Sequence, residues 1–172
     1  SCLLIDIGCT PTSDTEVLPN VTHEIPIQPI PRSEWEQYLL PNANYDIAVG
    51  LPSLKSLQSL LDKKKNISPS VNVFATNKGE LSFIVETDIV TIGSHFKYLE
   101  VFKNRCRKPR ADEEPVTEAS CQVDSRKLAL IMENINFIEV TLSYSIKQDN
   151  LLNVCCDLRG VALLNFILPA IN

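Results

Sequence analysis

The chain has 172 residues, of which 44% are hydrophobic and 22% charged, and a formal net charge of −5. This length accommodates one well-packed domain with some appended structure, and five glycines with 11 prolines exclude a fibrous or low-complexity chain. No apolar run approaches the roughly 20 residues of a membrane helix, so we expect no membrane partner.

The first 44 residues differ in character from the rest. Two strand-like stretches, residues 2–8 and 21–30, are joined by a polar run, and Pro26 and Pro29 indicate an edge position for the second. Because this piece lacks a helix, we interpret residues 1–30 as the last hairpin of a preceding domain. Residues 31–44 are then a connector, with Trp35 as an anchor within it. No basic flank precedes the apolar residues 3–7, so a signal peptide is not expected.

From Tyr45 onward the sequence predicts one pattern stated twice. A short apolar strand at residues 45–50 precedes a helix at about residues 52–65, whose leucines recur at the spacing of one helix face. Pro52 suits the first turn, and Asn66 with Pro69 ends the helix. Strands at 71–75, 81–86 and 89–95 follow, with a hairpin turn at 77–79.

The second statement of the pattern begins after an exposed, charged loop at residues 103–115. A strand at 117–123 leads to a short helix that Asp124 or Ser125 can cap, with Leu128, Ile131, Met132 and Ile135 on one face. Strands at 137–146, 151–158 and 161–168 complete it. Two such units predict an α+β domain over residues 45–172, with both helices packed on one face of antiparallel sheet.

Seven short strings follow one another along the chain. They are Val21-Thr22-His23-Glu24-Ile25-Pro26-Ile27, Ile30-Pro31-Arg32-Ser33-Glu34-Trp35, Lys64-Lys65-Asn66-Ile67-Ser68, Gly79-Glu80-Leu81, Ile84-Val85-Glu86-Thr87, His95-Phe96-Lys97-Tyr98-Leu99 and Phe166-Ile167-Leu168-Pro169-Ala170. Their order and spacing resemble the Hus-one subunit family of the nine-one-one checkpoint clamps. A duplicated strand-helix-three-strand unit is also the building plan of sliding clamps such as the replication clamp.

The resemblance implies a non-enzymatic subunit of a heterotrimeric ring in the nucleus. Such a ring, formed with two other clamp subunits, encircles double-stranded DNA at damage and scaffolds checkpoint and repair factors after a clamp loader places it. The alternatives are a homotrimeric replication clamp and a protein-binding adaptor that does not touch DNA. Most of the first clamp domain is absent from this sequence, so these residues alone cannot complete a ring.

In clamps of this kind the helices line the central channel, so their exposed faces should be basic. The two predicted helices hold six basic residues against two acidic ones, in a chain of net charge −5. This asymmetry favours contact with DNA phosphates without base readout. An ordinary solvated helix face is the plainer alternative for either helix alone. The predicted DNA-facing residues are Lys55, Lys63, Lys64, Lys65, Arg126 and Lys127.

Two further regions are candidate interaction sites. By analogy with replication clamps, Leu39, Leu40, Ile167 and Pro169 would edge a pocket for partner peptides, although they could equally pack against the domain. The basic string 103–110 is a candidate nuclear-import signal or DNA-contacting loop, or simply a solvated loop. The edge strands at 21–30 and 89–95 are candidates for pairing with neighbouring subunits, unless they are covered within the monomer.

Cofactor and catalytic signals are weak. The six cysteines form no C-x-x-C pair and neither histidine lies near a cysteine pair in the sequence, so we predict no metal and no cofactor. Cys121, Cys155 and Cys156 lie in apolar, strand-like runs, which favours reduced thiols in a reducing compartment over disulfides. The glycosylation sequons Asn20-Val21-Thr22 and Asn66-Ile67-Ser68 are discounted, because such triplets are common by chance. Cys121 with His95 or His23 is a conceivable nucleophile and base, but no catalytic motif supports this pairing.

Overall fold

The computed structural model describes residues 2–7, 21–38, 45–107, 114–135, 141–158 and 162–171. The chain divides into two units, Ser1–Asn42 and Ala43–Asn172, and each is described by itself. Among the described helices, none is both long and apolar enough to cross a bilayer.

The second unit contains the predicted pattern twice. Its first repeat holds β3 (Ile47–Gly50), α2 (Leu54–Lys64), β4 (Ser70–Thr76), β5 (Leu81–Glu86) and β6 (Thr91–Phe96). Its second repeat holds β7 (Glu118–Asp124), α3 (Ser125–Asn134), β8 (Thr141–Lys147), β9 (Leu151–Leu158) and β10 (Ala162–Pro169). A short 3-10 helix, η2 (Lys103–Arg105), lies between the repeats. The predicted α+β class and the order strand, helix and three strands are confirmed.

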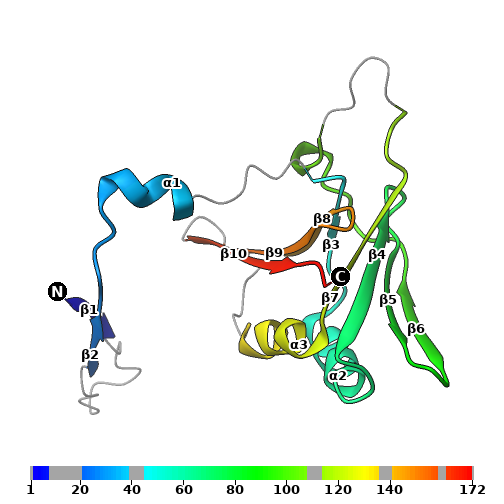
Figure 1. Ribbon diagram of the computed structural model, residues 1–172, viewed down its shortest axis with the longest axis horizontal. Coiled ribbons are helices and arrows are strands. Elements are labelled where there is room, and N and C mark those ends of the chain that lie inside the picture. The colour runs from blue at the N-terminus through cyan, green and yellow to red at the C-terminus, as the bar shows by residue number, and fades with distance from the viewer. Residues whose placement is uncertain are drawn as a thin grey trace, which may run out of the picture. The chain divides into compact units, whose positions relative to one another are not determined.

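The strands of the second unit form two four-stranded antiparallel sheets. The sheet orders are β10-β9-β8-β3 and β6-β5-β4-β7 (Figure 1). The last three strands of each repeat follow one another closely in the chain, so they pair in sequence. The first strand of each repeat is separated from them by a helix, and it pairs instead with the other repeat. This exchange joins the two repeats into one domain.

A single hydrophobic core draws residues from both repeats. Phe83 on β5 and Tyr144 on β8 meet edge to face with ring centroids 5.9 Å apart, and neither side chain is exposed. Such edge-to-face pairs are favourable beyond the area that they bury. The core therefore depends on both repeats at once.

The two helices begin with matched caps. The side chain of Ser53 accepts a hydrogen bond from the backbone N–H of Ser56, and Asp124 accepts from the N–H groups of Arg126 and Lys127. Side-chain acceptors at this position satisfy the free N–H groups of the first helical turn. The buried positions 4, 8 and 11 residues after the cap are Leu57, Leu61 and Lys64 in α2, and Leu128, Met132 and Ile135 after Asp124.

The β4–β5 turn requires its glycine. Gly79 has φ +80°, and a Cβ added there would collide with the carbonyl oxygen of Leu99. The backbone N–H of Leu99 donates to the Gly79 carbonyl oxygen at 2.9 Å, so the segment after β6 is fastened to this turn. Only glycine adopts this backbone conformation with so close a neighbour without strain.

The first unit is a two-stranded ribbon followed by a short helical segment. β1 (Cys2–Ile7) pairs antiparallel with β2 (Val21–Pro26), and η1 (Arg32–Glu34) leads into α1 (Trp35–Tyr38). One face of the ribbon carries the pair Leu3 and Ile25, both more than 40% exposed. A two-stranded ribbon is marginal in water without a cover for its apolar face.

Candidate nucleic-acid-facing surface

The helices α2 and α3 pack side by side, below β9 and β10 in Figure 1. The Gln58 side-chain amide, in the second turn of α2, donates to the carbonyl oxygen of Met132 at the end of α3 at 2.8 Å. Asn66, just after α2, lines the same shallow groove as Arg126 in the first turn of α3. The helices therefore run antiparallel, and their outward sides form one surface.

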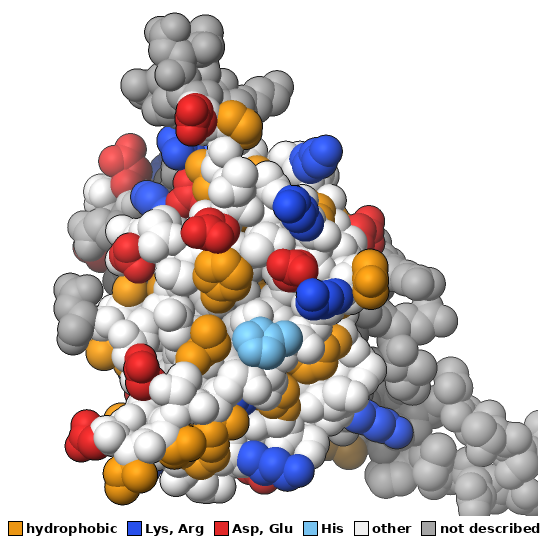
Figure 2. Space-filling view, turned by 90° about the vertical axis from the view of Figure 1, so that its right-hand side faces the viewer, with side chains coloured by type: hydrophobic (Ala, Val, Ile, Leu, Met, Phe, Trp, Pro, Cys, Tyr) orange, Lys and Arg blue, Asp and Glu red, His pale blue; other side chains and the backbone are white. Residues whose placement is uncertain are grey.

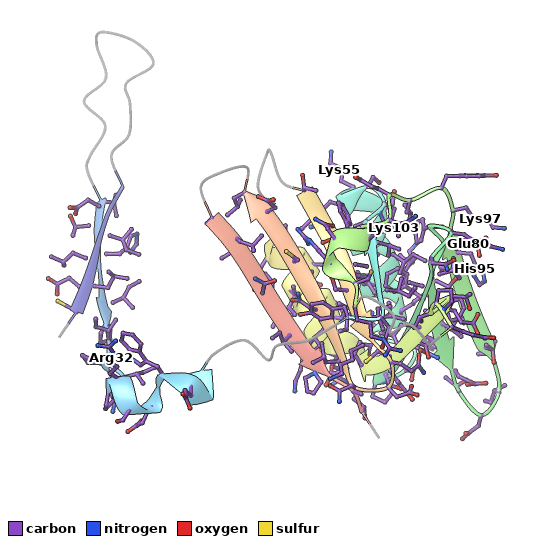
Figure 3. All side chains as sticks on the ribbon, turned by 90° about the horizontal axis from the view of Figure 1, so that it is seen from above. Arg32, Lys55, Glu80, His95, Lys97 and Lys103 are labelled. Carbon is purple, nitrogen blue, oxygen red and sulfur yellow. The ribbon has the colours of Figure 1, made fainter. Side chains whose placement is uncertain are left out.

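Four of the six predicted DNA-facing residues lie on this outward side. Lys55 and Lys63 are exposed and lie on the side of α2 opposite its buried stripe, and Lys55 is labelled in Figure 3. Arg126 and Lys127 are exposed in the first turn of α3. Long cationic side chains at such positions can reach phosphate groups while the helix backbone stays in place.

The run Lys63-Lys64-Lys65 does not form one patch. Successive residues on a helix point about 100° apart, so three in a row diverge. Lys64 is only 3% exposed, and its Nζ donates to the carbonyl oxygen of Ile92 on β6 at 2.8 Å. Burial lowers the pKa of the Lys64 ammonium. The expectation that Lys64 faces DNA is therefore wrong, because its side chain points into the domain.

Lys65 points sideways from α2 toward α3. Its Nζ lies 2.7 Å from Asp62 Oδ1 and 2.6 Å from Glu133 Oε1, and these hydrogen bonds raise the pKa of the Lys65 ammonium. The pair of carboxylates neutralises its charge. The groove beside it, about 360 Å³, is lined by Lys65, Asn66, Arg126, Leu130 and Glu133. Of the cationic residues predicted for α2, only Lys55 and Lys63 are both exposed and without an acidic partner among the described residues.

The signal for the burial of Lys64 was present in the sequence. Counting along each helix from Ser53 and Asp124 aligns Lys64 with Ile135, which is 1% exposed. This alignment identifies Lys64 as a core position. At the level of the sequence, Asp62 and Glu133 were counted only in the net charge of the helices. In the structure, their carboxylates bind the Lys65 ammonium directly.

The described part of the basic string is held by contacts within the domain. The Arg105 guanidinium donates to Ser143 Oγ and lies over the Phe102 ring, and Arg107 Nε is 2.8 Å from Asp46 Oδ1. Lys103 is exposed, while residues 108–110 lie outside the described part of the chain. At least two of the cations in this string therefore stabilise the segment beside β3.

Of the four predicted partner-binding residues, two lie in the described part of the chain and two lie outside it. Ile167 and Pro169 lie two residues apart on β10, and therefore on one face of its sheet, with Ile167 half-buried and Pro169 exposed. Leu39 and Leu40 lie outside the described residues. In the connector, the Trp35 indole N–H donates to the Ile30 carbonyl oxygen at 3.0 Å, and Arg32 lies over the ring.

Within the second unit, the conceivable nucleophile Cys121 and the conceivable base His95 do not meet. Cys121 is fully buried on β7, which β4 and β5 separate from β6, and His95 on β6 contacts Ser82 Oγ through Nδ1 at 2.8 Å. Burial raises the pKa of the Cys121 thiol to about 11, which disfavours the reactive thiolate. Among the described residues the five cysteines are free thiols, and no group of three or more His, Cys, Asp or Glu side chains could hold a metal.

The four edge strands of the two sheets differ in cover. Along β3, the Gly50 N–H donates to the Glu100 carbonyl oxygen and the Phe102 N–H to that of Ala48. Along β7, carbonyl oxygens accept from the N–H groups of Asp149 and Ile171. Within the described part of the chain, no backbone hydrogen bond covers the outer edge of β6 or β10. Each sheet therefore has one covered edge and one open edge.

Charge is arranged differently elsewhere on the domain. The side that carries β4, β5 and β6, on the right of Figure 1, has acidic and basic side chains interspersed with hydrophobic ones (Figure 2). Lys97 on this side pairs with Glu80 at 3.4 Å, and both are labelled in Figure 3. The helix surface differs from this side because Lys63, Arg126 and Lys127 are exposed there with no acidic partner among the described residues.

Comparison with known proteins identifies the family of this chain. The family described as Hus1-like protein matches residues 3–172. The chain is 34% identical to the checkpoint protein Hus1-like of Drosophila melanogaster over 171 residues, 99% of the chain and 58% of the relative. It is 33% identical to the checkpoint protein HUS1 of Homo sapiens over 128 residues, 74% of the chain and 45% of the relative. The chain thus spans about half the length of these curated relatives.

A solved structure shares the fold. The crystal structure of PCNA from Thermococcus kodakaraensis superposes with a TM-score of 0.63 at 16% identity, over 88% of this chain and 56% of that one. PCNA is a sliding clamp, so the predicted sliding-clamp fold and the predicted resemblance are both confirmed.

Proposed function

The chain belongs to the Hus1-like protein family, and from this we propose that it is a non-catalytic subunit of a heterotrimeric DNA sliding clamp. The ring would encircle DNA at damage and scaffold checkpoint signalling and repair factors in the nucleus. The observation that carries the proposal is the family match over residues 3–172 on a fold shared with PCNA.

The outward surface of the helix pair supports contact with DNA. Lys55, Lys63, Arg126 and Lys127 would approach phosphates of the encircled duplex, and Lys65 would contribute little because two carboxylates neutralise it. Contacts of this kind hold a duplex without reading its sequence. A clamp that moves along DNA needs this sequence independence.

The open edges support assembly into a ring. We propose that β6 pairs with a strand of one neighbouring subunit, because an uncovered edge invites strand addition. We further propose that residues 1–30 are the last hairpin of a first clamp domain, residues 31–44 the interdomain connector and residues 45–172 the second domain. The exposed apolar face of the β1–β2 ribbon is consistent with packing against the rest of such a domain.

Protein partners would dock near the connector. Leu39, Leu40, Ile167 and Pro169 are the residues that we propose to edge a pocket for peptides of repair or checkpoint factors. The clamp loader is the other expected partner. Residues 103–110 stay a candidate for nuclear import, although Arg105 and Arg107 are engaged within the domain.

The test is co-expression of the full-length protein with candidate clamp subunits, followed by native mass measurement. We expect a 1:1:1 complex that binds primed DNA in a salt-dependent manner. A stable homotrimer would return the assignment to a replication clamp. A chain that stays monomeric with every candidate would overturn the clamp subunit altogether.

A further inference from the structure

Lys64 is buried in a way that the DNA-facing surface does not explain. Its side chain is 3% exposed, and its ammonium has no carboxylate partner among the described residues. Within the described part of the chain, its hydrogen-bond partner is the carbonyl oxygen of Ile92, 2.8 Å from Nζ. Burying an ammonium against a neutral acceptor is unfavourable compared with an apolar side chain. A role that needs the hydrogen bond would account for a lysine at this position.

The second repeat shows what the position tolerates. Eleven residues after its N-cap, α3 is followed by Ile135, which is 1% exposed and belongs to the hydrophobic core. Eleven residues after Ser53, α2 ends in Lys64. The same core position thus holds an aliphatic residue in one repeat and a lysine in the other, so packing alone does not demand the lysine.

The strand that Lys64 contacts is weakly anchored to the core. On β5 the inward side chains Leu81, Phe83 and Val85 are all 0% exposed, whereas on β6 Ile92 is 36% exposed. Phe96, at the far end of β6, packs against Phe83 with ring centroids 6.2 Å apart. The half of β6 nearest the hairpin turn therefore depends on its ladder with β5 and on the Lys64 contact.

We propose that Lys64 is a positioning residue that holds the first half of β6 in the register needed to pair with a neighbouring subunit. The proposal rests on the proposed function, because it takes β6 as the assembly edge. Strand addition requires the receiving edge to present its backbone groups in a fixed row, and a loose edge must be ordered on binding. Hydrogen bonds from charged donors are among the stronger ties available for this purpose.

The test compares two variants of adjacent residues in the full-length protein. Lys64→Met keeps an unbranched side chain of similar length and removes the ammonium. Lys63→Met makes the same change on the outward side of α2. We expect Lys64→Met to speed amide exchange in residues 91–94 and to weaken ring assembly, each about tenfold. Its melting temperature should stay equal or rise, because an apolar side chain replaces a buried charge.

The control variant should change DNA binding and leave β6 and ring assembly as they are. Lys63→Met is expected to leave exchange in β6 and ring assembly unchanged, while it reduces the salt dependence of DNA binding by the assembled ring. Normal assembly of Lys64→Met would overturn the inference. A parallel fall of its assembly and its melting temperature would also overturn it, because Lys64 would then be an ordinary stabilising residue.

A failure of the proposed function is distinguishable from these outcomes. If the natural protein joins no clamp subunits, the assembly edge itself is wrong. Amide exchange in the isolated chain then still tests whether the hydrogen bond from Lys64 to Ile92 holds the first half of β6 in place. Unchanged exchange in Lys64→Met would overturn that part of the inference too.

Discussion

The two repeats of the second unit share a plan and differ in how they use one position. Each begins its helix at a side-chain cap and buries positions 4, 8 and 11 after it, yet the eleventh is Lys64 in the first repeat and Ile135 in the second. The first repeat thus has a polar tie from its helix to an open edge strand. The comparison teaches that two repeats can share one hydrophobic core and still differ at a single buried position. That position holds a polar residue where the helix contacts an open edge strand.

The largest expected effect tests whether the repeats share one core. Leu61→Ala and Met132→Ala remove matched side chains that are 1% and 0% exposed. Each is expected to lower the free energy of unfolding by about 2–5 kcal/mol, because each leaves a cavity in the same core. Denaturant unfolding followed by circular dichroism should give one transition for both variants. Separate transitions for the two repeats would contradict a shared core.

Alkaline pH should act in opposite directions on Cys121 in the second repeat and Lys64 in the first. Burial raises the pKa of Cys121 in the second repeat to about 11, so the folded state keeps its proton while the unfolded chain loses it. Stability from this group is full below its ordinary pKa of 9.0 and is lost between about pH 9 and about 11, at about 1 kcal/mol per pH unit. Lys64 acts in reverse, since the penalty on its buried charge is relieved as pH rises through its lowered pKa.

Thermal unfolding at several pH values between 8 and about 11 separates these contributions. Cys121→Ala should flatten the alkaline loss of stability, and Lys64→Met should steepen it. An unchanged profile in Cys121→Ala would mean that the buried thiol does not titrate in this range.

A smaller difference is expected between the two helix caps. Asp124 accepts from two N–H groups at 2.9 Å each, whereas Ser53 accepts one at 3.4 Å. Asp124→Ala should therefore lower the free energy of unfolding by about 1 kcal/mol, aided by the favourable charge at a helix N-terminus. Ser53→Ala should cost less. Denaturant titration of both variants decides the order, and an equal or reversed loss would contradict it.

The smallest effect distinguishes neighbouring lysines on one helix. Lys63→Ala should lower the slope of log affinity for primed DNA against log salt by about 1 in the assembled ring. Lys65→Ala should change it less, because Asp62 and Glu133 already neutralise that ammonium. Lys78→Ala, in the β4–β5 turn, serves as a control with the same charge change. Equal slopes for the three variants would argue against DNA contact by the helix surface.

The elements were accessible from the sequence because their signals are local. Leucine spacing, the caps at Ser53 and Asp124 and the glycine turn at residues 77–79 all act within a few residues. They predicted α2, α3 and the hairpins to within a few residues of their observed bounds. The repeated order then predicted the clamp class, and the short strings pointed to the family that the comparisons established.

The site was predicted less completely. The exposed positions of Lys55, Lys63, Arg126 and Lys127 follow from the helix pattern, and the structure agrees. The burial of Lys64 could have been inferred from its alignment with Ile135. The neutralisation of Lys65 could not, because Glu133 belongs to another helix 68 residues away in the sequence.

By itself, the sequence determined the repeat, the two helices and the family, since periodicity, caps and turns depend on neighbours in the chain. The tertiary structure alone decided that β3 and β7 exchange sheets, which edges stay open and where each lysine points. Strand pairing and side-chain burial depend on surfaces brought together from distant parts of the chain. No local pattern encodes which of several compatible strands will supply the partner.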